Sequence, residues 1–150
     1  MGVTRGRFEY FRDLLTGPLG RDPAGLRALD IGCGGGFLAE EFARLGCRVV
    51  GVGPSEISIE TARRHAAGAG LDVTYLVGAG EQLPVEDSSF DIAYCCDLLE
   101  HVSGLDSVIA ETARVLKPRG VYILRHRQSD RVQQGRWHQA PTGMVTDAYI

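Results

Sequence analysis

The chain has 150 residues, the usual length of one domain, with 44% hydrophobic and 23% charged residues, as is ordinary for a globular protein. The formal net charge is -3, and no basic stripe with interleaved aromatic residues occurs, so we expect no nucleic-acid partner. No apolar run is long enough to span a membrane or to form the core of a signal peptide. We therefore expect a single domain over residues 1–150 with no membrane span.

Four cysteines, Cys33, Cys47, Cys95 and Cys96, are present, and no pair has the spacing of a zinc ribbon. Two of them are adjacent in an apolar run, which favours buried, reduced thiols over disulfides. This use of cysteine predicts a cytoplasmic protein.

The first predicted element is a helix over residues 3–15. Phe8, Phe11, Leu14 and Leu15 form one apolar stripe at helical spacing. The next ten residues, 16–25, hold two prolines and three glycines and are expected to form a loop.

From residue 26 onward, short apolar runs alternate with amphipathic segments. We predict strands over 26–31, 48–52, 73–77, 90–96 and 121–124. We predict helices over 36–45, ended by Gly46, over 55–67, capped by Ser55, and over 105–116, followed by a turn at 117–120. Because the strands are almost continuously apolar, the pattern predicts an α/β fold, a three-layer doubly wound Rossmann-like sheet that is mostly parallel. Residues 125–150 show neither the two-residue period of a strand nor the 3.6-residue period of a helix. They are interpreted as an atypical tail that follows a core over residues 26–124.

The most informative segment is residues 29–36, Leu-Asp-Ile-Gly-Cys-Gly-Gly-Gly. It lies between a predicted strand and a predicted helix, so it forms a glycine-rich turn at a helix N-terminus. Such a turn brings bare backbone close to a ligand and directs amide groups toward it. The segment therefore predicts a site for a nucleotide-like cofactor.

A nicotinamide cofactor does not fit this segment. Its fingerprint requires a third glycine where this chain has Phe37, and an acidic residue after the next strand where this chain has Gly53. The dehydrogenase interpretation fails at both positions.

Further motifs follow the segment 29–36 along the chain. They are Gly-Val-Gly-Pro-Ser at 51–55, Gly-Ala-Gly-Glu-Gln-Leu-Pro at 78–84, Ser-Phe-Asp-Ile at 89–92, Leu-Glu-His-Val at 99–102 and Leu-Lys-Pro-Arg-Gly at 116–120. Together with the segment 29–36, and in this order, they resemble the motifs of class I S-adenosylmethionine-dependent methyltransferases. The Leu-Ala-Glu at 38–40, the segment 99–102 and an Arg-x-x-Tyr pattern at 7–10 resemble the ubiquinone-biosynthesis O-methyltransferase branch.

The resemblance implies S-adenosylmethionine as cofactor, S-adenosylhomocysteine as product and O-methylation of a small-molecule acceptor. It implies that Arg7 meets the cofactor carboxylate and that Gly32 and Gly34 let the backbone approach. Asp30 orients the loop or a bound water. The implied cofactor-binding residues are Arg7, Asp30, Gly32, Cys33, Gly34, Gly53, Pro54, Ala79, Gly80, Glu81, Cys96 and Asp97.

His101 is the candidate general base, because it follows the fourth predicted strand and a histidine titrates near neutral pH. Asp97, Glu100 and His101 have i, i+3, i+4 spacing, and the resemblance implies a divalent metal at such a cluster. Acids at a helix start also favour the helix dipole without any metal. Our prediction is no metal, with this trio as the candidate if one binds. The other histidines, His65, His126 and His138, have no matching partners and are interpreted as surface residues.

The sequence departs from the family at three places. The acid that ends the family's second strand and accepts hydrogen bonds from the ribose hydroxyls is Gly53, with Glu56 as a substitute one turn later. The family's acid against the adenine amino group is Ala79. The helix and antiparallel hairpin that follow the family's fifth strand have little counterpart in 125–150, so the C-terminal hairpin is expected to be incomplete and a partner copy could complete the sheet edge.

These departures keep an alternative open, namely a catalytically impaired or truncated methyltransferase-like binding module. The acceptor itself and its pathway cannot be read from this sequence.

Overall fold

The computed structural model describes residues 8–9, 12–13, 15–17, 20–96 and 105–125. Its strands are β1 (Arg27–Ile31), β2 (Arg48–Gly53), β3 (Val73–Val77), β4 (Phe90–Cys96) and β5 (Leu116–Arg125), and its helices are α2 (Phe37–Arg44), α3 (Glu56–Gly68) and α4 (Leu105–Val115). Near the N-terminus, residues 8–9, 12–13 and 15–16 are helical, as predicted for that segment.

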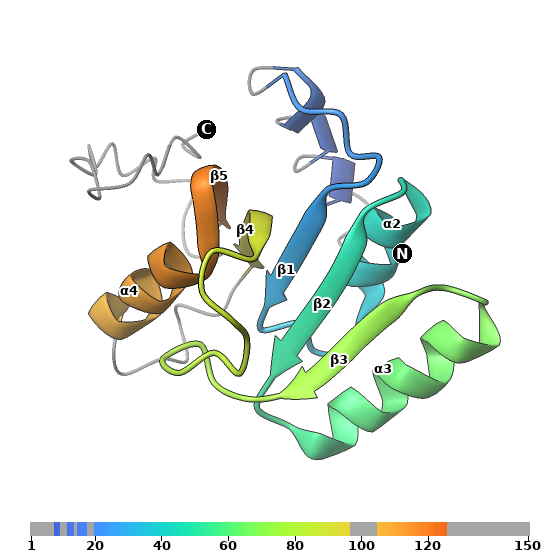
Figure 1. Ribbon diagram of the computed structural model, residues 1–150. Coiled ribbons are helices and arrows are strands. Elements are labelled where there is room, and N and C mark those ends of the chain that lie inside the picture. Colours follow the sequence, from blue (N-terminus) through green and yellow to red (C-terminus); the bar gives the residue numbers. More distant parts are fainter. Residues whose placement is uncertain (1–7, 10–11, 14, 18–19, 97–104, 126–150) are drawn as a thin grey trace.

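The strands form one parallel sheet in the order β3-β2-β1-β4-β5 (Figure 1). The order reverses at β1, which pairs with β2 on one side and with β4 on the other. In open parallel sheets of this kind, ligands bind at the carboxyl ends of the strands beside this reversal. The predicted Rossmann-like fold is confirmed for the part of the chain described here.

The strand register lines up one row of side chains across the middle of the sheet. Tyr75 on β3 pairs with Gly51 on β2, Gly51 pairs with Asp30 on β1, and Asp30 pairs with Tyr94 on β4. The three side chains of this row are buried, and we call Tyr75, Asp30 and Tyr94 the polar row. Because paired residues of parallel strands point to the same face, the polar row lies on one side of the sheet.

Two apolar clusters fill the two faces of the sheet, as three layers require. The face that carries the polar row is covered by α2, α3 and the N-terminal helical residues. There Phe42 of α2 stacks on Tyr94 with ring centroids 4.5 Å apart, and Phe8 meets Phe42 edge-on at 5.7 Å. The opposite face buries Leu29 and Ile31 with Val115 at the end of α4.

Local capping follows the sequence closely. The Ser55 hydroxyl accepts a hydrogen bond from the Ser58 amide at 3.2 Å, so Ser55 caps α3 as predicted. Gly46 follows α2 with a φ of 99°, a left-handed conformation that glycine adopts without strain.

The predicted turn at 117–120 lies inside β5 rather than before it. Phe90 pairs with Leu116 and Ile92 pairs with Val121, so four residues of β5 lie opposite one residue of β4. This bulge is compact, because a Cβ on Gly120 would lie 2.8 Å from the Lys117 carbonyl oxygen. The chain does turn at residues 117–120, as predicted. Its pairing with β4, however, begins before this turn, at Leu116, and continues after it, from Val121.

The absence of a side chain at Gly51 makes room for Tyr75. A Cβ at position 51 would lie 2.7 Å from the Tyr75 Cδ1 atom. We therefore expect Gly51→Ala to lower the free energy of unfolding by about 1–3 kcal/mol, measured by urea denaturation. Gly68→Ala is the matched control, since a Cβ there meets nothing within 4 Å and alanine favours the helix. Equal stability of the two variants would contradict this packing.

Candidate cofactor site

The glycine loop, Gly32–Gly36, connects β1 to α2 and is fixed at both ends. The amides of Gly32 and Cys33 donate to the carbonyl of Val52 at 2.8 and 3.1 Å, which joins the loop to the end of β2. The amide of Gly36 donates to the Cys33 carbonyl at 3.0 Å and closes the turn. The loop therefore has a defined shape before any ligand is considered.

The middle of the glycine loop is open. The amides of Gly34 and Gly35 donate to no acceptor among the residues described. Gly34 has a φ of 53°, and a Cβ there would meet nothing within 4 Å. Two amide donors beside a helix N-terminus suit a carboxylate or another anionic group, and the missing Cβ leaves room for it.

Asp30 lies below this loop as a buried acid. It is 3% exposed, and its Oδ2 atom has no hydrogen-bond partner among the described residues. Burial raises the pKa of the Asp30 carboxyl to about 7, although the neighbouring Tyr94 hydroxyl acts in the opposite direction. A buried carboxyl with a free oxygen suits a water molecule or a cationic group of a ligand.

The end of β2 carries no acid in the structure either. The Gly53 carbonyl accepts a hydrogen bond from the Gly78 amide at 2.9 Å, so the carboxyl ends of β2 and β3 are joined. A Cβ at Gly53 would lie 3.5 Å from Cys33 Sγ and 3.5 Å from Ile59 Cδ1, which are ordinary contacts. Pro54 and Glu56 follow with exposed side chains.

The loop after β3 brings the other predicted residues to the same edge. Ala79 forms an isolated bridge with Gln82, Gly80 is buried and the Glu81 side chain is half-buried. The predicted residues of the glycine loop, of the end of β2 and of this loop thus follow neighbouring strand ends.

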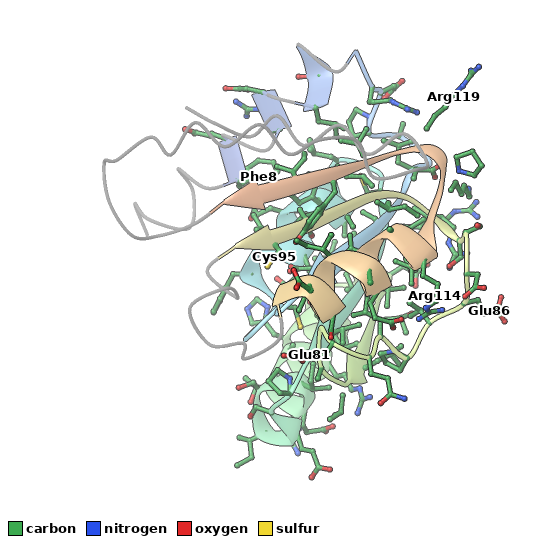
Figure 2. The ribbon with its side chains drawn as sticks, turned by 90° about the vertical axis from the view of Figure 1, so that its left-hand side faces the viewer. Phe8, Glu81, Glu86, Cys95, Arg114 and Arg119 are labelled. Atoms are coloured by element: carbon green, nitrogen blue, oxygen red, sulfur yellow. The ribbon has the colours of Figure 1, made fainter. Side chains whose placement is uncertain are left out.

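Sequence reasoning missed the side chains that hold the continuation of this loop against α4. The Leu83 amide donates to the Glu111 carboxylate at 2.7 Å, and Arg114 donates to the carbonyls of Leu83 and Val85 at 2.9 Å each. Arg114 also pairs with Asp87, and Figure 2 shows it on α4 beside the loop that carries Glu86. The hydrogen bond from Arg114 holds the pKa of the Glu111 carboxyl below its usual range. The spacing of Glu111 and Arg114 on one helix face was the available signal.

Cys33, Cys47 and Cys95 are buried and form no disulfide with one another, as predicted. Burial raises the pKa of the Cys33 thiol to about 12 and that of Cys47 to about 11, so neither is a ready nucleophile. Cys95 is buried in the apolar cluster on the α4 side of the sheet. The backbone of Cys96 ends β4 and pairs with Arg125.

Four predicted site residues, Arg7, Asp97, Glu100 and His101, lie outside the described residues, and their roles stay predictions. Within the described ranges, no group of three or more histidine, cysteine or acidic side chains could hold a metal ion. In the same ranges, no helix is both long enough and apolar enough to cross a bilayer.

The prediction for His65 is confirmed in one part and wrong in the other, while His126 and His138 lie outside the described residues. His65 is exposed, as predicted, but it has a partner, because its Nδ1 atom lies 2.6 Å from the buried Glu40 carboxylate. Glu40 is on α2 and His65 is on α3, so this contact joins the two helices that flank the glycine loop.

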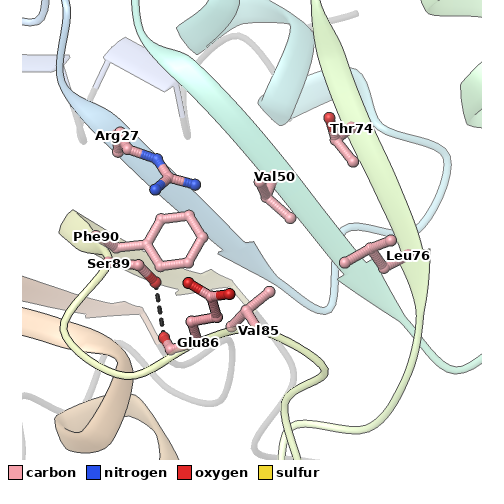
Figure 3. Close-up of a pocket in the computed structure, with 8 residues that line it drawn as sticks. All are labelled: Arg27, Val50, Thr74, Leu76, Val85, Glu86, Ser89 and Phe90. Atoms are coloured by element: carbon pink, nitrogen blue, oxygen red, sulfur yellow. Dashed lines mark hydrogen bonds between the residues drawn. The ribbon is translucent and has the colours of Figure 1, made fainter.

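A hollow of about 270 Å³ lies elsewhere on the molecule, on the face of the sheet opposite the polar row (Figure 3). Its lining residues come from β1, β2, β3 and the segment leading into β4, and they are Arg27, Val50, Thr74, Leu76, Val85, Glu86, Ser89 and Phe90. The Arg27 guanidinium stacks over the Phe90 ring at 5.0 Å. None of the predicted cofactor-binding residues lines this hollow.

Comparison with known proteins identifies the family of this chain. The family model described as a methyltransferase domain matches residues 29–124, and the chain belongs to that family. A ubiquinone biosynthesis O-methyltransferase of Chelativorans sp. (strain BNC1) is 43% identical over 124 residues, covering 79% of this chain and 49% of that protein. The chain spans about half the length of the curated relatives it matches.

Solved structures show the same fold. An S-adenosylmethionine-dependent methyltransferase from Mesorhizobium loti is 31% identical, with a TM-score of 0.59 over 65% of this chain and 44% of that chain. The cyclase SpnF is also 31% identical, with a TM-score of 0.70 over 85% of this chain and 49% of that chain. The Mesorhizobium loti protein is described as S-adenosylmethionine-dependent, and the curated relatives are named as O-methyltransferases.

The residues present fit one end of S-adenosylmethionine and leave a gap at the other. The free amides of Gly34 and Gly35 suit its carboxylate, and the free oxygen of Asp30 lies in the buried row below them. No acidic side chain at position 53 is available for the ribose. The fit is therefore good at the amino-acid end.

The buried Asp30 predicts a pH-dependent stability. Between its ordinary pKa of 3.8 and about 7, the folded chain holds a proton that the unfolded chain has released. The free energy of unfolding should therefore fall as pH rises through this window, by up to about 4 kcal/mol, and stay level above it. Asp30→Asn removes the titrating group, so urea denaturation from about pH 4 to pH 8 should show a smaller fall.

The control is Asp91→Asn, because Asp91 is paired with Lys117 at 3.3 Å and is partly exposed. It should keep the wild-type fall with pH. If the Asp30→Asn variant follows the same curve as the wild type, Asp30 does not titrate in this range.

Proposed function

We propose that this chain is an S-adenosylmethionine-dependent methyltransferase that transfers the methyl group to an oxygen atom of a small molecule. The observation that carries the proposal is the glycine loop, which is fixed at both ends while its middle amides stay free. The curated relatives are named as O-methyltransferases, which supports oxygen as the acceptor atom.

We assign the cofactor contacts by position along the sheet edge. The backbone of Gly32, Cys33 and Gly34 holds the amino-acid end, with Asp30 below it and Arg7 at the carboxylate. The ribose lies against Gly53 and Pro54. The adenine side is formed by Ala79, Gly80 and Glu81, and the end of β4 contributes Cys96 and Asp97.

When bound, the cofactor supplies an electrophilic methyl group on a sulfonium centre. The chain's part is to orient the cofactor and acceptor and to exclude water. His101 takes the proton of the acceptor hydroxyl, since an imidazole accepts a proton near neutral pH. A divalent metal held by Asp97, Glu100 and His101 would instead make the acceptor hydroxyl more acidic. If the chain binds the acceptor only when a divalent metal is present, the metal and not His101 alone activates the hydroxyl.

A partner strand is part of the same proposal. β5 is the last strand on its side of the described sheet, and an unpaired strand edge invites pairing with another chain. A second copy that pairs there would complete the sheet.

The first experiment is calorimetric titration of the purified chain with S-adenosylhomocysteine, with NAD as control. We expect binding in the micromolar range for the first ligand and none for NAD. If circular dichroism shows a folded chain that binds neither ligand, the methyltransferase proposal is wrong for this chain.

Position 53 gives a sharper test of where the ribose lies. A Cβ at Gly53 makes only ordinary contacts at 3.5 Å, so position 53 has room for the first atom of a side chain. A carboxylate that accepts from two ribose hydroxyls contributes about 2–3 kcal/mol, so Gly53→Asp should tighten S-adenosylhomocysteine binding tens- to hundredfold.

Gly53→Asn is the matched control, with the same shape and no charge. It should gain clearly less affinity than the aspartate variant in the same titration. If Gly53→Asp binds no more tightly than the wild type, position 53 does not face the ribose.

A further inference from the structure

Tyr75 connects the sheet to the glycine loop. It lies on β3, two strands away from the loop in the sheet, and its side chain is 2% exposed. Its ring crosses the position above Gly51, where a Cβ would lie 2.7 Å from Cδ1 and 2.9 Å from Cε1. The phenol thereby reaches the start of α2, and its hydroxyl donates to the Gly36 carbonyl at 3.3 Å.

The Gly36 carbonyl is the point where the glycine loop becomes a helix. It also accepts the Glu40 amide at 3.0 Å, which is the first hydrogen bond of α2. Gly36 itself has a φ of 85°, and a Cβ there would overlap the Tyr75 hydroxyl oxygen. Two glycines, Gly51 and Gly36, are therefore required by the path of a single tyrosine side chain.

The surroundings keep the Tyr75 hydroxyl in place and protonated. Glu40 follows on α2 and is held by His65 from α3 at 2.6 Å, so both helices beside the phenol are tied together. Burial, with the negative charge of Glu40 nearby, raises the pKa of Tyr75 well above its ordinary range. The phenol is therefore a hydrogen-bond donor throughout the pH range in which the chain would work.

We propose that Tyr75 is a positioning residue for the cofactor, whose hydroxyl holds the Gly36 carbonyl and so sets the shape of the glycine loop. This inference rests on the proposed function, because it assumes that the loop binds S-adenosylmethionine. The Gly36 amide, on the other side of the same Cα, closes the turn onto the Cys33 carbonyl at 3.0 Å, so the turn that carries the amides of Gly34 and Gly35 ends at the residue that Tyr75 holds. The ring fills space, whereas the hydroxyl holds the Gly36 carbonyl together with the Glu40 amide.

The test is Tyr75→Phe, which keeps the ring and removes the hydroxyl. We expect binding of S-adenosylhomocysteine to weaken about three- to tenfold in calorimetric titration, as the loss of one hydrogen bond predicts. In the ligand-free variant, native-state hydrogen exchange of the Glu40 amide should speed up by a similar factor, beyond any change in global stability measured with urea.

Tyr122→Phe is the matched control. Tyr122 is a buried tyrosine on the opposite face of the sheet, in β5, and lies in the other apolar cluster. Its variant should leave both the affinity for S-adenosylhomocysteine and the exchange of the Glu40 amide unchanged, even where the urea midpoint shifts.

The inference and the proposed function are contradicted by different results. If the wild type binds S-adenosylhomocysteine and Tyr75→Phe binds it equally well, Tyr75 does not position the loop for the cofactor. If the wild type does not bind, the proposed function fails and the inference fails with it, while the exchange of the Glu40 amide still decides whether the hydroxyl holds the loop.

Discussion

The site depends on the two amide hydrogen bonds from Gly32 and Cys33 to the carbonyl of Val52. They attach the start of the glycine loop to the end of β2, and the bond from Gly78 to the Gly53 carbonyl attaches the end of β2 to the segment after β3. The carboxyl ends of three neighbouring strands are therefore joined by backbone bonds alone. This continuous edge places the glycine loop, position 53 and residues 79–81 beside one another without help from any particular side chain.

Charge at this edge is distributed unevenly. Asp30 is a buried acid at the end of β1, and burial opposes its ionisation, while the end of β2 carries no acid. A cationic group brought close to Asp30 would favour its charged form, and so the binding of such a group and the loss of the Asp30 proton favour each other. The chain's affinity for the cofactor is thus expected to come mainly from the amino-acid end of the ligand.

The sequence predicted the parts of this structure that local patterns encode. The strands β1 to β4 and the three described helices lie within about two residues of the expected ranges, because apolar runs, caps and glycines act over a few residues. The gathering of the site residues at the carboxyl ends of the strands could also be predicted, since the connections of a parallel sheet determine which strand ends lie at the same edge. β5 was predicted too short because a bulge of four residues looks like a turn in sequence.

The contacts that hold the site together could not be predicted in this way. Tyr75 and Gly36 are 39 positions apart, His65 and Glu40 are 25 apart, and Arg114 and Leu83 are 31 apart. Each contact joins two elements whose separation depends on the packed structure, and no local period records it. The partner of His65 was missed for this reason, although its side chain is exposed as predicted.

The glycines around the site illustrate why a glycine in a motif has to be explained by its own surroundings. Gly36 and Gly51 exclude a side chain because Tyr75 occupies the space, and Gly34 leaves space that a ligand can use. Gly53 has neither reason, since a Cβ there makes only ordinary contacts. The packing around position 53 therefore does not explain why this chain has glycine where the family has an acid. Because one fold supports different chemistries, as the similarity to the cyclase SpnF also indicates, such a change affects what the site binds before it affects how the chain folds.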